Sequence, residues 1–524
     1  MTAIFTHASR FKRMQVALLA TIAIAALQSG CAQLQARPEL PVESALQIQE
    51  LTELDRLFAS HEAKHPNKSG FRLIREGPEA FITRLQSARL AGRSLDVQTY
   101  IWHDDTTGLY LVNEILKAAD RGVRVRLLVD DMDARTKNLG FAGLAAHSNI
   151  AVRLFNPFAS RHGQMAFMGE GLTSFKRINH RMHNKTWIAD NRFAVAGGRN
   201  LGDEYFGASN EVNFVDLDFA MAGPIVRDAS ASFDRYWNSA AAYPMETLDP
   251  ERVTPSALAE LRARLAANID EKRVQAYRQV LGSDDAIRRL LSGDWPMHWT
   301  DHVQFIADDP AKIWMAEGDT NRSKVLPALL PLFQNARTDV AVISPYFVPG
   351  KGGVSILTTA AANGARVRVL TNSLAGNDVA AVHGGYSRSR PELLEGGVQL
   401  WELKPTPGSD ANDSLFGSSG ASLHTKALVV DSRLTFVGSY NLDPRSTWLN
   451  CEQGVLVEHA AIAHELEEIF SEQSTGARAW QVSLENEVLR WSDGAETFDS
   501  EPKASWGKRF TAWMVRWLNV DAQL

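Results

Sequence analysis

Two motifs of the form His-x-Lys-x-x-x-x-Asp carry side chains that could do chemistry together. The first begins at His183 and the second at His424. Alternate residues of an extended strand point the same way, so each motif presents an imidazole beside an ammonium group. An imidazole can attack phosphorus or move a proton, and an ammonium group neutralises phosphate oxygens. The candidate catalytic residues are His183, Lys185, Asp190, His424, Lys426 and Asp431.

Two further pairs of polar residues share the spacing of these motifs. His424 follows His183 by 241 residues, and the same interval separates one pair of asparagines and one pair of glutamates. An asparagine amide can donate hydrogen bonds to phosphate oxygens, and a glutamate can hold an imidazole in one tautomer. The candidate substrate-binding residues are Asn200, Asn441, Glu211 and Glu452.

The duplication predicts a single site with divided labour. Two histidines, one from each half, can face each other across a pseudo-two-fold axis. One would attack phosphorus and form a phospho-histidine, while the other protonates the leaving alkoxide and later deprotonates the incoming hydroxyl. The residues alone leave open which histidine takes which role. No step of this scheme needs a metal ion or a cofactor.

The elements around the motifs are duplicated as well. In each half a β-branched run is followed by a helical stretch and a second β-branched run, an order that favours parallel pairing. The expected strand, helix and strand are 94–102, 109–119 and 124–131 in the first half, and 340–348, 354–362 and 366–373 in the second.

The first thirty-one residues have the pattern of an export signal. Arg10, Lys12 and Arg13 precede an apolar run from Met14 to Leu27, which is short for a bilayer span. Small residues then stand directly before Cys31, as in bacterial lipoproteins, so we expect Cys31 to carry the lipid. Ordinary signal cleavage and an uncleaved anchor are the alternatives. Each of them places the protein in the cell envelope, attached to or exported across a membrane.

Composition narrows the remaining choices. The 524 residues are 45 % hydrophobic and carry a formal charge of −6, which weighs against a nucleic-acid partner. Two cysteines make no disulfide framework, and no zinc-type spacing is present, so we expect no metal and no cofactor. The predicted divisions are a signal peptide (1–31), an N-terminal helical segment (32–77), a first repeat (78–244), a helical connector (245–297), a second repeat (298–480) and a tail with an amphipathic helix (481–524).

The amphipathic helix at the carboxyl end has an aromatic face and basic flanks. Trp506, Phe510, Trp513, Met514, Trp517 and Leu518 share the face. Such a helix either packs on its domain or lies in a membrane interface. The sequence leaves both open.

The paired motifs resemble the phospholipase D superfamily over about residues 70–480. The segments 179–185 (NHRMHNK), 197–206 (GGRNLGDEYF), 345–349 (PYFVP) and 438–450 (GSYNLDPRSTWLN) are similar to the bacterial cardiolipin synthase branch, and most of all to its C type. The resemblance implies an α/β fold of two tandem phospholipase D-like repeats. Each repeat would be a mixed, mostly parallel sheet flanked by helices, and the two would pack as a pseudo-two-fold pair.

The resemblance also implies a function. The family transfers a phosphatidyl group between phospholipids such as phosphatidylglycerol at a membrane surface. It favours His183 as nucleophile and His424 as acid and base, and it makes Asp190 and Asp431 supports. A hydrolase that releases phosphatidic acid and a nuclease are the alternatives; the export signal and the acidic charge weigh against the nuclease. Secondary candidates for phosphate or headgroup contact are His180, Arg181, His383, Tyr386 and Arg390.

Overall fold

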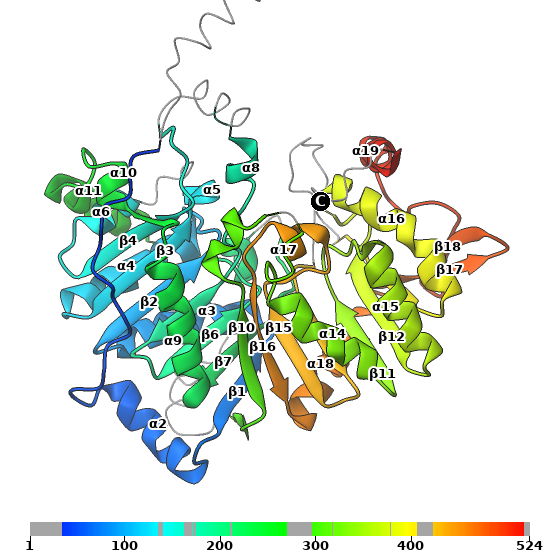
Figure 1. The fold of residues 1–524 in the computed structure, drawn as a ribbon, viewed down its shortest axis with the longest axis horizontal. Helices are drawn as coiled ribbons and strands as arrows, with labels where there is room; N and C mark the ends of the chain where they lie inside the picture. The colour runs from blue at the N-terminus through cyan, green and yellow to red at the C-terminus, as the bar shows by residue number, and fades with distance from the viewer. Residues whose placement is uncertain are drawn as a thin grey trace, which may run out of the picture.

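The computed structural model describes residues 34–517, apart from residues 135–139, 162–169, 171–173, 210–211, 270–295, 317, 378 and 406–422. Two large mixed sheets stand side by side, one from each half of the chain, with helices over their faces (Figure 1). Among these residues, no helix combines the length and the apolar character that crossing a bilayer requires.

The first sheet is built around the predicted strand–helix–strand unit. Helix α4 (Thr106–Asp120) connects β2 to β3, which pair in parallel, and β3 pairs in parallel with β4. In spatial order the strands are β8 (Ala242–Pro244), β4 (Ile150–Phe155), β3 (Arg124–Asp130), β2 (Ser94–Thr99), β5 (Thr186–Ala189), β6 (Phe193–Gly197), β7 (Asp218–Ala222), β1 (Ser69–Ile74) and β9 (His298–Thr300).

The second sheet repeats this order. Helix α15 (Gly350–Ala362) connects β11 to β12, and β11, β12 and β13 are parallel. In spatial order the strands are β10 (Val303–Ala307), β16 (Gln453–Glu458), β15 (Leu434–Gly438), β14 (Ala427–Val430), β11 (Asp339–Ile343), β12 (Arg366–Asn372), β13 (Gln399–Leu403), β17 (Ala479–Glu485), β18 (Val488–Ser492) and β19 (Thr497–Phe498).

The α/β class, the tandem repeats and the mixed sheets with flanking helices are confirmed, but the parallel share is smaller than predicted. In the described residues only two strand pairs of each sheet are parallel. The motif strands enter as hairpins instead: β5 turns into β6 at Asp190, and β14 turns into β15 at Asp431. Both aspartates have positive φ, 55° and 52°, a conformation that short polar side chains tolerate in tight turns.

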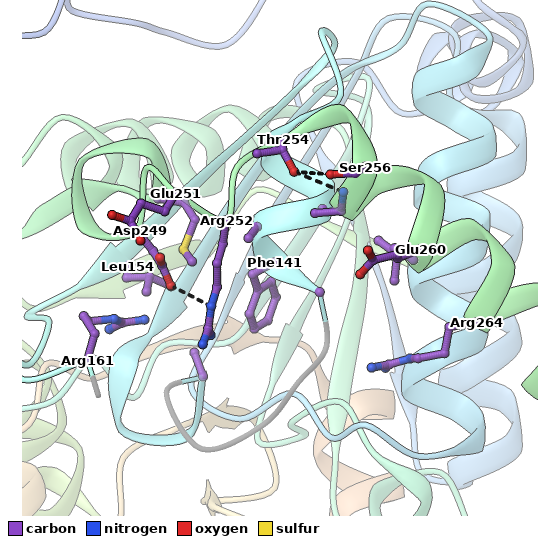
Figure 2. Close-up of a pocket in the computed structure, with 17 residues that line it drawn as sticks. Phe141, Leu154, Arg161, Asp249, Glu251, Arg252, Thr254, Ser256, Glu260 and Arg264 are labelled. Atoms are coloured by element: carbon purple, nitrogen blue, oxygen red, sulfur yellow. Dashed lines mark hydrogen bonds and ion pairs between the residues drawn. The ribbon is translucent and has the colours of Figure 1, made fainter. Parts of the chain in front are cut away.

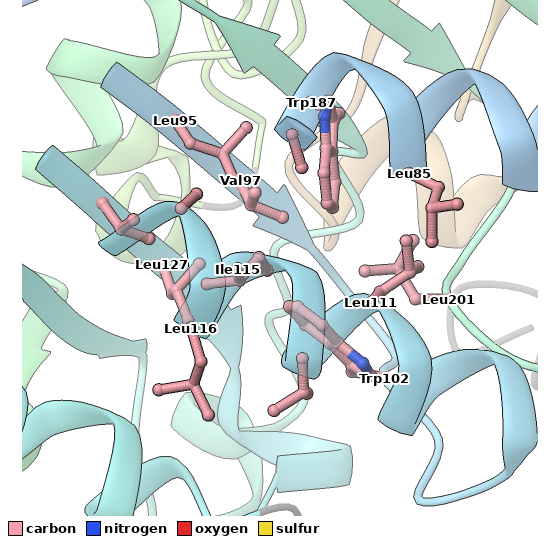
Figure 3. Close-up of a cluster of buried hydrophobic side chains, with 14 of the residues drawn as sticks. Leu85, Leu95, Val97, Trp102, Leu111, Ile115, Leu116, Leu127, Trp187 and Leu201 are labelled. Atoms are coloured by element: carbon pink, nitrogen blue, oxygen red, sulfur yellow. The ribbon is translucent and has the colours of Figure 1, made fainter. Parts of the chain in front are cut away.

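The core of the first repeat lies between its sheet and helices α3 (Gly77–Leu90) and α4 (Figure 3). Val97 and Leu127 from the strands pack with Ile115 from α4. The Trp187 ring is 2 % exposed in this core, and its Nε1 donates a hydrogen bond of 2.9 Å to Ser87 Oγ. The partnered indole can therefore stay buried without losing a hydrogen bond to water.

A second core joins the repeats. Ile188 and Ala194 of the first sheet share it with Val429, Val437 and Val455 of the second. Strands β6 and β7 contact β15 and β16 directly. Helices α9 (Pro224–Trp237) and α18 (Ala460–Gln473) also contribute to it. A third core holds helices α14 (Val325–Asn335), α15 and α16 (Ala380–Glu395) on the outer face of the second sheet. The shared core fixes one repeat against the other, which a site built from both requires.

The segments outside the repeats are more structured than expected. The N-terminal segment holds α2 (Glu53–Lys64) but also β1, which joins the first sheet. The connector begins with α10 (Met245–Leu248) and α11 (Pro255–Asn268), and α11 packs on α6 (Phe141–Ala145). In the tail, β17 and β18 extend the second sheet. Helix α19 (Trp506–Trp517) then packs on α16. Cys31 and Leu518 lie outside the described residues.

Candidate active site

The two motif histidines stand just before the first strands of the two hairpins. Residue 186 pairs with Gln98 near the carboxyl end of β2, so His183 lies at the carboxyl end of the parallel strands. The backbone N–H of His183 donates to the carbonyl of Cys451 at 2.8 Å, and that of His424 donates to Val215 at 2.8 Å. Each motif is thus held by backbone of the opposite repeat.

The side chains follow the same exchange between repeats. His183 Nδ1 lies 2.9 Å from Glu452 Oε2, and His424 Nδ1 lies 2.6 Å from Asp216 Oδ2. Both carboxylates are fully buried. A carboxylate at Nδ1 fixes the imidazole tautomer and leaves Nε2 for chemistry. Each histidine therefore depends on an acid from the other half of the chain.

Asp216 is a site residue that the sequence analysis missed. Glu211, which the 241-residue spacing selected, lies outside the described residues. Glu452 follows Asp216 by 236 residues, so the regular spacing ends after Asn200. The available signal was local: Asp216 and Glu452 each stand just before the strand that follows the hairpin, β7 or β16.

The two halves hold their carboxylates differently. In the first repeat, a Cβ added to Gly198 would lie 2.2 Å from Asp216 Oδ1, so only glycine leaves room for the acid. In the second repeat the equivalent residue is Ser439, whose hydroxyl donates a hydrogen bond to Glu452. The shorter acid accompanies the smaller neighbour, and the longer acid gains a donor.

Burial controls the charge of the imidazoles. It lowers the pKa of His183 to about 4, with Lys185 and Lys426 acting in the same direction and Glu452 opposing them. The pKa of His424 also falls well below its ordinary value, first through burial and then through Lys426 and Lys185. Both rings are therefore neutral at neutral pH, with Nδ1–H donating to the carboxylate and Nε2 unprotonated.

Glu452 and Asp216 differ in acidity. Burial alone would raise the pKa of Glu452, but the nearby His183 and Lys185 outweigh it and hold that pKa below its usual value. Burial raises the pKa of Asp216, and the nearby Lys426 and Arg199 offset only part of the rise. Glu452 is the better partner for a histidine that becomes positively charged.

The motif lysines complete the cluster. Lys185 Nζ donates to the backbone oxygen of its own motif histidine, His183, at 2.6 Å, and Lys426 makes the same contact with His424. Burial lowers the pKa of Lys185 well below its ordinary value. A phosphodiester anion would offset that cost, because opposite charge favours the ammonium form.

The motif aspartates are not in this cluster. Asp190 sits at the far end of β5, and its carboxylate accepts backbone N–H groups of Gly92, Arg93 and Ser94 at 2.7–3.2 Å. Asp431 accepts the equivalent groups before β11, from Thr338 and its neighbours. These contacts anchor the start of β2 and β11. The structure gives both aspartates a supporting position and no contact with a reacting group.

The two candidate asparagines are unequal. Asn200 Oδ1 accepts from the backbone N–H of Ile101 at 3.2 Å, and its Nδ2 donates to the Tyr205 hydroxyl at 2.9 Å. Asn441 is 4 % exposed, and its Oδ1 has no hydrogen-bond partner among the described residues. Asn200 thus supports its own half, while Asn441 keeps hydrogen-bonding capacity for a ligand.

Three aromatic rings line the site that the motif pattern did not reveal. Tyr205 and Phe214 approach the ring of His424 with centroid distances of 5.3 and 5.4 Å. Tyr100 approaches His183 at 5.1 Å and lies 5.3 Å from Lys185 Nζ. Their bulk keeps the histidines oriented and reduces water around them.

Most of the secondary candidates serve structure. Arg181 is fully buried and pairs with Asp130 at 3.2 Å. Arg390 is buried between Glu402 at 3.1 Å and Glu501 at 2.7 Å, and His383 lies 3.3 Å from the same Glu501. This cluster ties the tail to α16 rather than facing a headgroup.

The largest hollow is elsewhere. A cavity of about 560 Å³ lies between α6, α10 and α11 (Figure 2). Three arginines and three acids line it in balance, and Arg252 pairs with Asp249 at 3.5 Å. None of its lining residues belongs to the paired motifs, so it offers no groove for the chemistry described above.

A family model described as "Cardiolipin synthase, PLD-like domain" matches residues 81–237 and 329–474. The chain is 38 % identical to cardiolipin synthase C of Escherichia coli, over 88 % of this chain and 97 % of that one. It is 25 % identical to a cardiolipin synthase of Staphylococcus aureus, over 79 % of this chain and 70 % of the relative.

The fold is shared with a solved structure of low identity. The phosphatidylserine synthase of Haemophilus influenzae superposes with a TM-score of 0.56 at 13 % identity, covering 90 % of this chain and all of that one. The matched family model falls on both repeats, and the paired motifs lie on the equivalent hairpins. The chain therefore belongs to the cardiolipin synthase family of phospholipase D-superfamily enzymes.

Proposed function

We propose that the protein transfers a phosphatidyl group from one phospholipid, such as phosphatidylglycerol, to a hydroxyl of another, and so forms cardiolipin. The observation that carries the proposal is the pair of imidazoles, each bonded through Nδ1 to a buried carboxylate of the opposite repeat. The names of the family's characterised relatives support the lipid substrate.

The reaction would run in two displacements. His183 Nε2 attacks the donor phosphorus, the bond to the headgroup oxygen breaks, and His424 gives that oxygen a proton. The acceptor hydroxyl then loses its proton to His424 and attacks phosphorus, and the bond to His183 breaks. Ionised Glu452 would stabilise the charge on phosphorylated His183, which favours that residue as nucleophile. Lys185 and Lys426 would balance the non-bridging oxygens.

Vesicles that contain labelled phosphatidylglycerol test the reaction. We expect labelled cardiolipin and free glycerol in equal amounts, because each transfer releases one headgroup. The measurement is a time course of both products by mass spectrometry.

Water is the competing acceptor in this assay. Phosphatidic acid as the sole lipid product would reject the transferase and identify a hydrolase of the same site. An exposed-surface variant, Glu468→Gln, serves as the matched control for protein quality, since it lies far from the motifs on α18.

We further propose that the enzyme works on a membrane, anchored in the cell envelope through lipidated Cys31. Helix α19 buries Ala512 and Val515 against α16 and exposes Trp506 (78 %), Phe510 (46 %) and Trp513 (58 %). These three rings stack along the helix. The beginning of the described chain, α8 (Phe175–Ile178), α17 (Pro444–Trp448) and α19 gather along the upper edge in Figure 1. That edge follows the carboxyl ends of the parallel strands and therefore the site.

The membrane contact is testable apart from the anchor. In a Cys31→Ser background, the double change Trp506→Ser and Trp513→Ser should weaken binding to phosphatidylglycerol vesicles by about tenfold or more, because both indoles lose apolar burial. Sedimentation with vesicles measures the bound fraction. Val488→Ser, an exposed apolar change on β18, is the control. Equal sedimentation of both variants would reject this surface.

A further inference from the structure

Arg322 is a buried guanidinium without a counter-ion among the described residues. It is 3 % exposed, its Nε has no hydrogen-bond partner there, and its Nη2 lies 3.5 Å from His180 Nε2. His180 accepts no charge from this contact, because its Nδ1 is bonded to the backbone oxygen of Leu449 at 2.9 Å. Keeping a guanidinium out of water without an anion is costly. The site is suited to an anion supplied from outside.

A second arginine stands beside it. Arg445 donates to Oδ1 and the backbone oxygen of Asn179, at 2.7 and 3.0 Å, which are both neutral acceptors. After burial, Arg322, Arg445 and Lys312 are the charges that lower the pKa of His180, whereas Lys185 and Lys426 act on His183 and His424. The two groups of cations are therefore centred at different points. Lys312 is already paired with Asp308 at 2.6 Å, so the two arginines carry the uncompensated charge.

An apolar cavity adjoins these arginines. Its volume is about 370 Å³, and its walls are almost wholly apolar. Leu326 and Leu330 line it from α14, which begins three residues after Arg322. Pro444, Thr447 and Trp448 line it from α17, the short helix that carries Arg445. The cation pair and the cavity thus share two elements.

The cavity is also continuous with the active site. Tyr440 and Leu442 line it on either side of Asn441, and the backbone oxygen of Ser439 lies 3.1 Å from His183 Nδ1. On the other side, Tyr100 contacts the His183 ring, and Arg445 is among the charges that act on its hydroxyl.

We infer that Arg322, Arg445 and the apolar cavity form a second phospholipid site, in which the acceptor lipid is held by its phosphate and one acyl chain. This inference rests on the proposed function. The reacting phosphate belongs to the donor and is held by the motif residues, so a second phosphate beside it belongs to the acceptor. In the transfer step, the acceptor hydroxyl gives its proton to His424, its oxygen bonds to phosphorus, and the bond from phosphorus to His183 breaks.

Three soluble acceptors separate the two halves of this site. Dihexanoyl phosphatidylglycerol has a phosphate and chains, glycerol 3-phosphate has a phosphate alone, and glycerol has neither. With a long-chain labelled donor, Arg322→Gln should lower transfer to both phosphate-bearing acceptors by about tenfold, because a charge-assisted contact is lost, and leave transfer to glycerol unchanged. Ile356→Trp, which fills the cavity, should lower transfer only to the lipid acceptor.

The matched controls are Lys324→Gln and Ser355→Trp, exposed neighbours on the same segments that line neither feature. Equal losses with all three acceptors, or no loss with any, would overturn the second site. A binding measurement keeps it testable without turnover: His183→Ala protein should bind two molecules of dihexanoyl phosphatidylglycerol by calorimetry, and one after Arg322→Gln. Failure of the proposed function alone would appear as hydrolysis by the unaltered enzyme with two-site binding intact.

Discussion

Replacing His183 or His424 by alanine is expected to lower phosphatidyl transfer by about 10⁴-fold or more, since one change removes the nucleophile and the other the proton carrier. Both imidazoles are 8 % exposed and bonded through Nδ1, so alanine removes the reacting Nε2 without adding a charge. The measurement is the rate of cardiolipin formation in vesicles.

The two variants differ in what they accumulate. With a phosphatidyl ester of p-nitrophenol, the leaving group needs no proton, so His424→Ala should still form the first covalent bond. We expect one burst of nitrophenol and a phosphatidyl adduct on His183 by mass spectrometry. His183→Ala should give neither. An adduct on His424 in the His183→Ala protein would reverse the assigned roles.

A surface histidine provides the control for this experiment. His464 on α18 has a side chain that is 77 % exposed, and His464→Ala should keep full activity. Substantial transfer by either motif variant would reject a site built from two histidines.

Glu452→Gln and Asp216→Asn are expected to lower kcat by about 10² to 10⁴-fold, because an amide can donate to Nδ1 and hold the wrong tautomer. The two changes lie in different repeats but should behave alike, since each disables the histidine of the opposite repeat. Steady-state rates, with Glu468→Gln as control, measure the effect. Retention of activity in both would mean that the carboxylates only stabilise the fold.

The pH profile gives a readout that a purely structural role would not move. The nucleophile must be neutral, so activity is lost as pH falls through the pKa of His183, about 4. Glu452 raises that pKa, and its removal should therefore shift the acid limb of kcat/KM to lower pH. A limb that stays in place would argue against the contact between Glu452 and His183.

The sequence was informative where the two halves repeat faithfully. The strand–helix–strand units and the hairpins at Asp190 and Asp431 occur at matching positions, because β-branched runs and turn residues act locally. The parallel share was overestimated because the pattern marks strands but not the hairpins that return antiparallel. Strand β1 and the hairpin of β17 and β18 were assigned to end segments because they lie outside the duplicated register.

The candidate site was harder to predict than the fold. Glu452 was selected by spacing, but its partner is His183 of the other repeat, and two similar repeats do not reveal which half donates to which. Asp216 was missed because the loop after Asn200 differs in length between the repeats. The aromatic wall of Tyr100, Tyr205 and Phe214 depends on packing that has no motif.

The exchange of carboxylates has a consequence for how the protein is made. The two imidazole–carboxylate pairs join residues 269 and 208 positions apart, so neither forms within one repeat. A growing chain that has finished its first repeat has His183 and Asp216 but no partner for either. Activity against lipids can appear only once β14 to β16 have been synthesised and docked. The enzyme is therefore latent during synthesis, when an early lipid-cleaving activity would meet the membrane of its own cell.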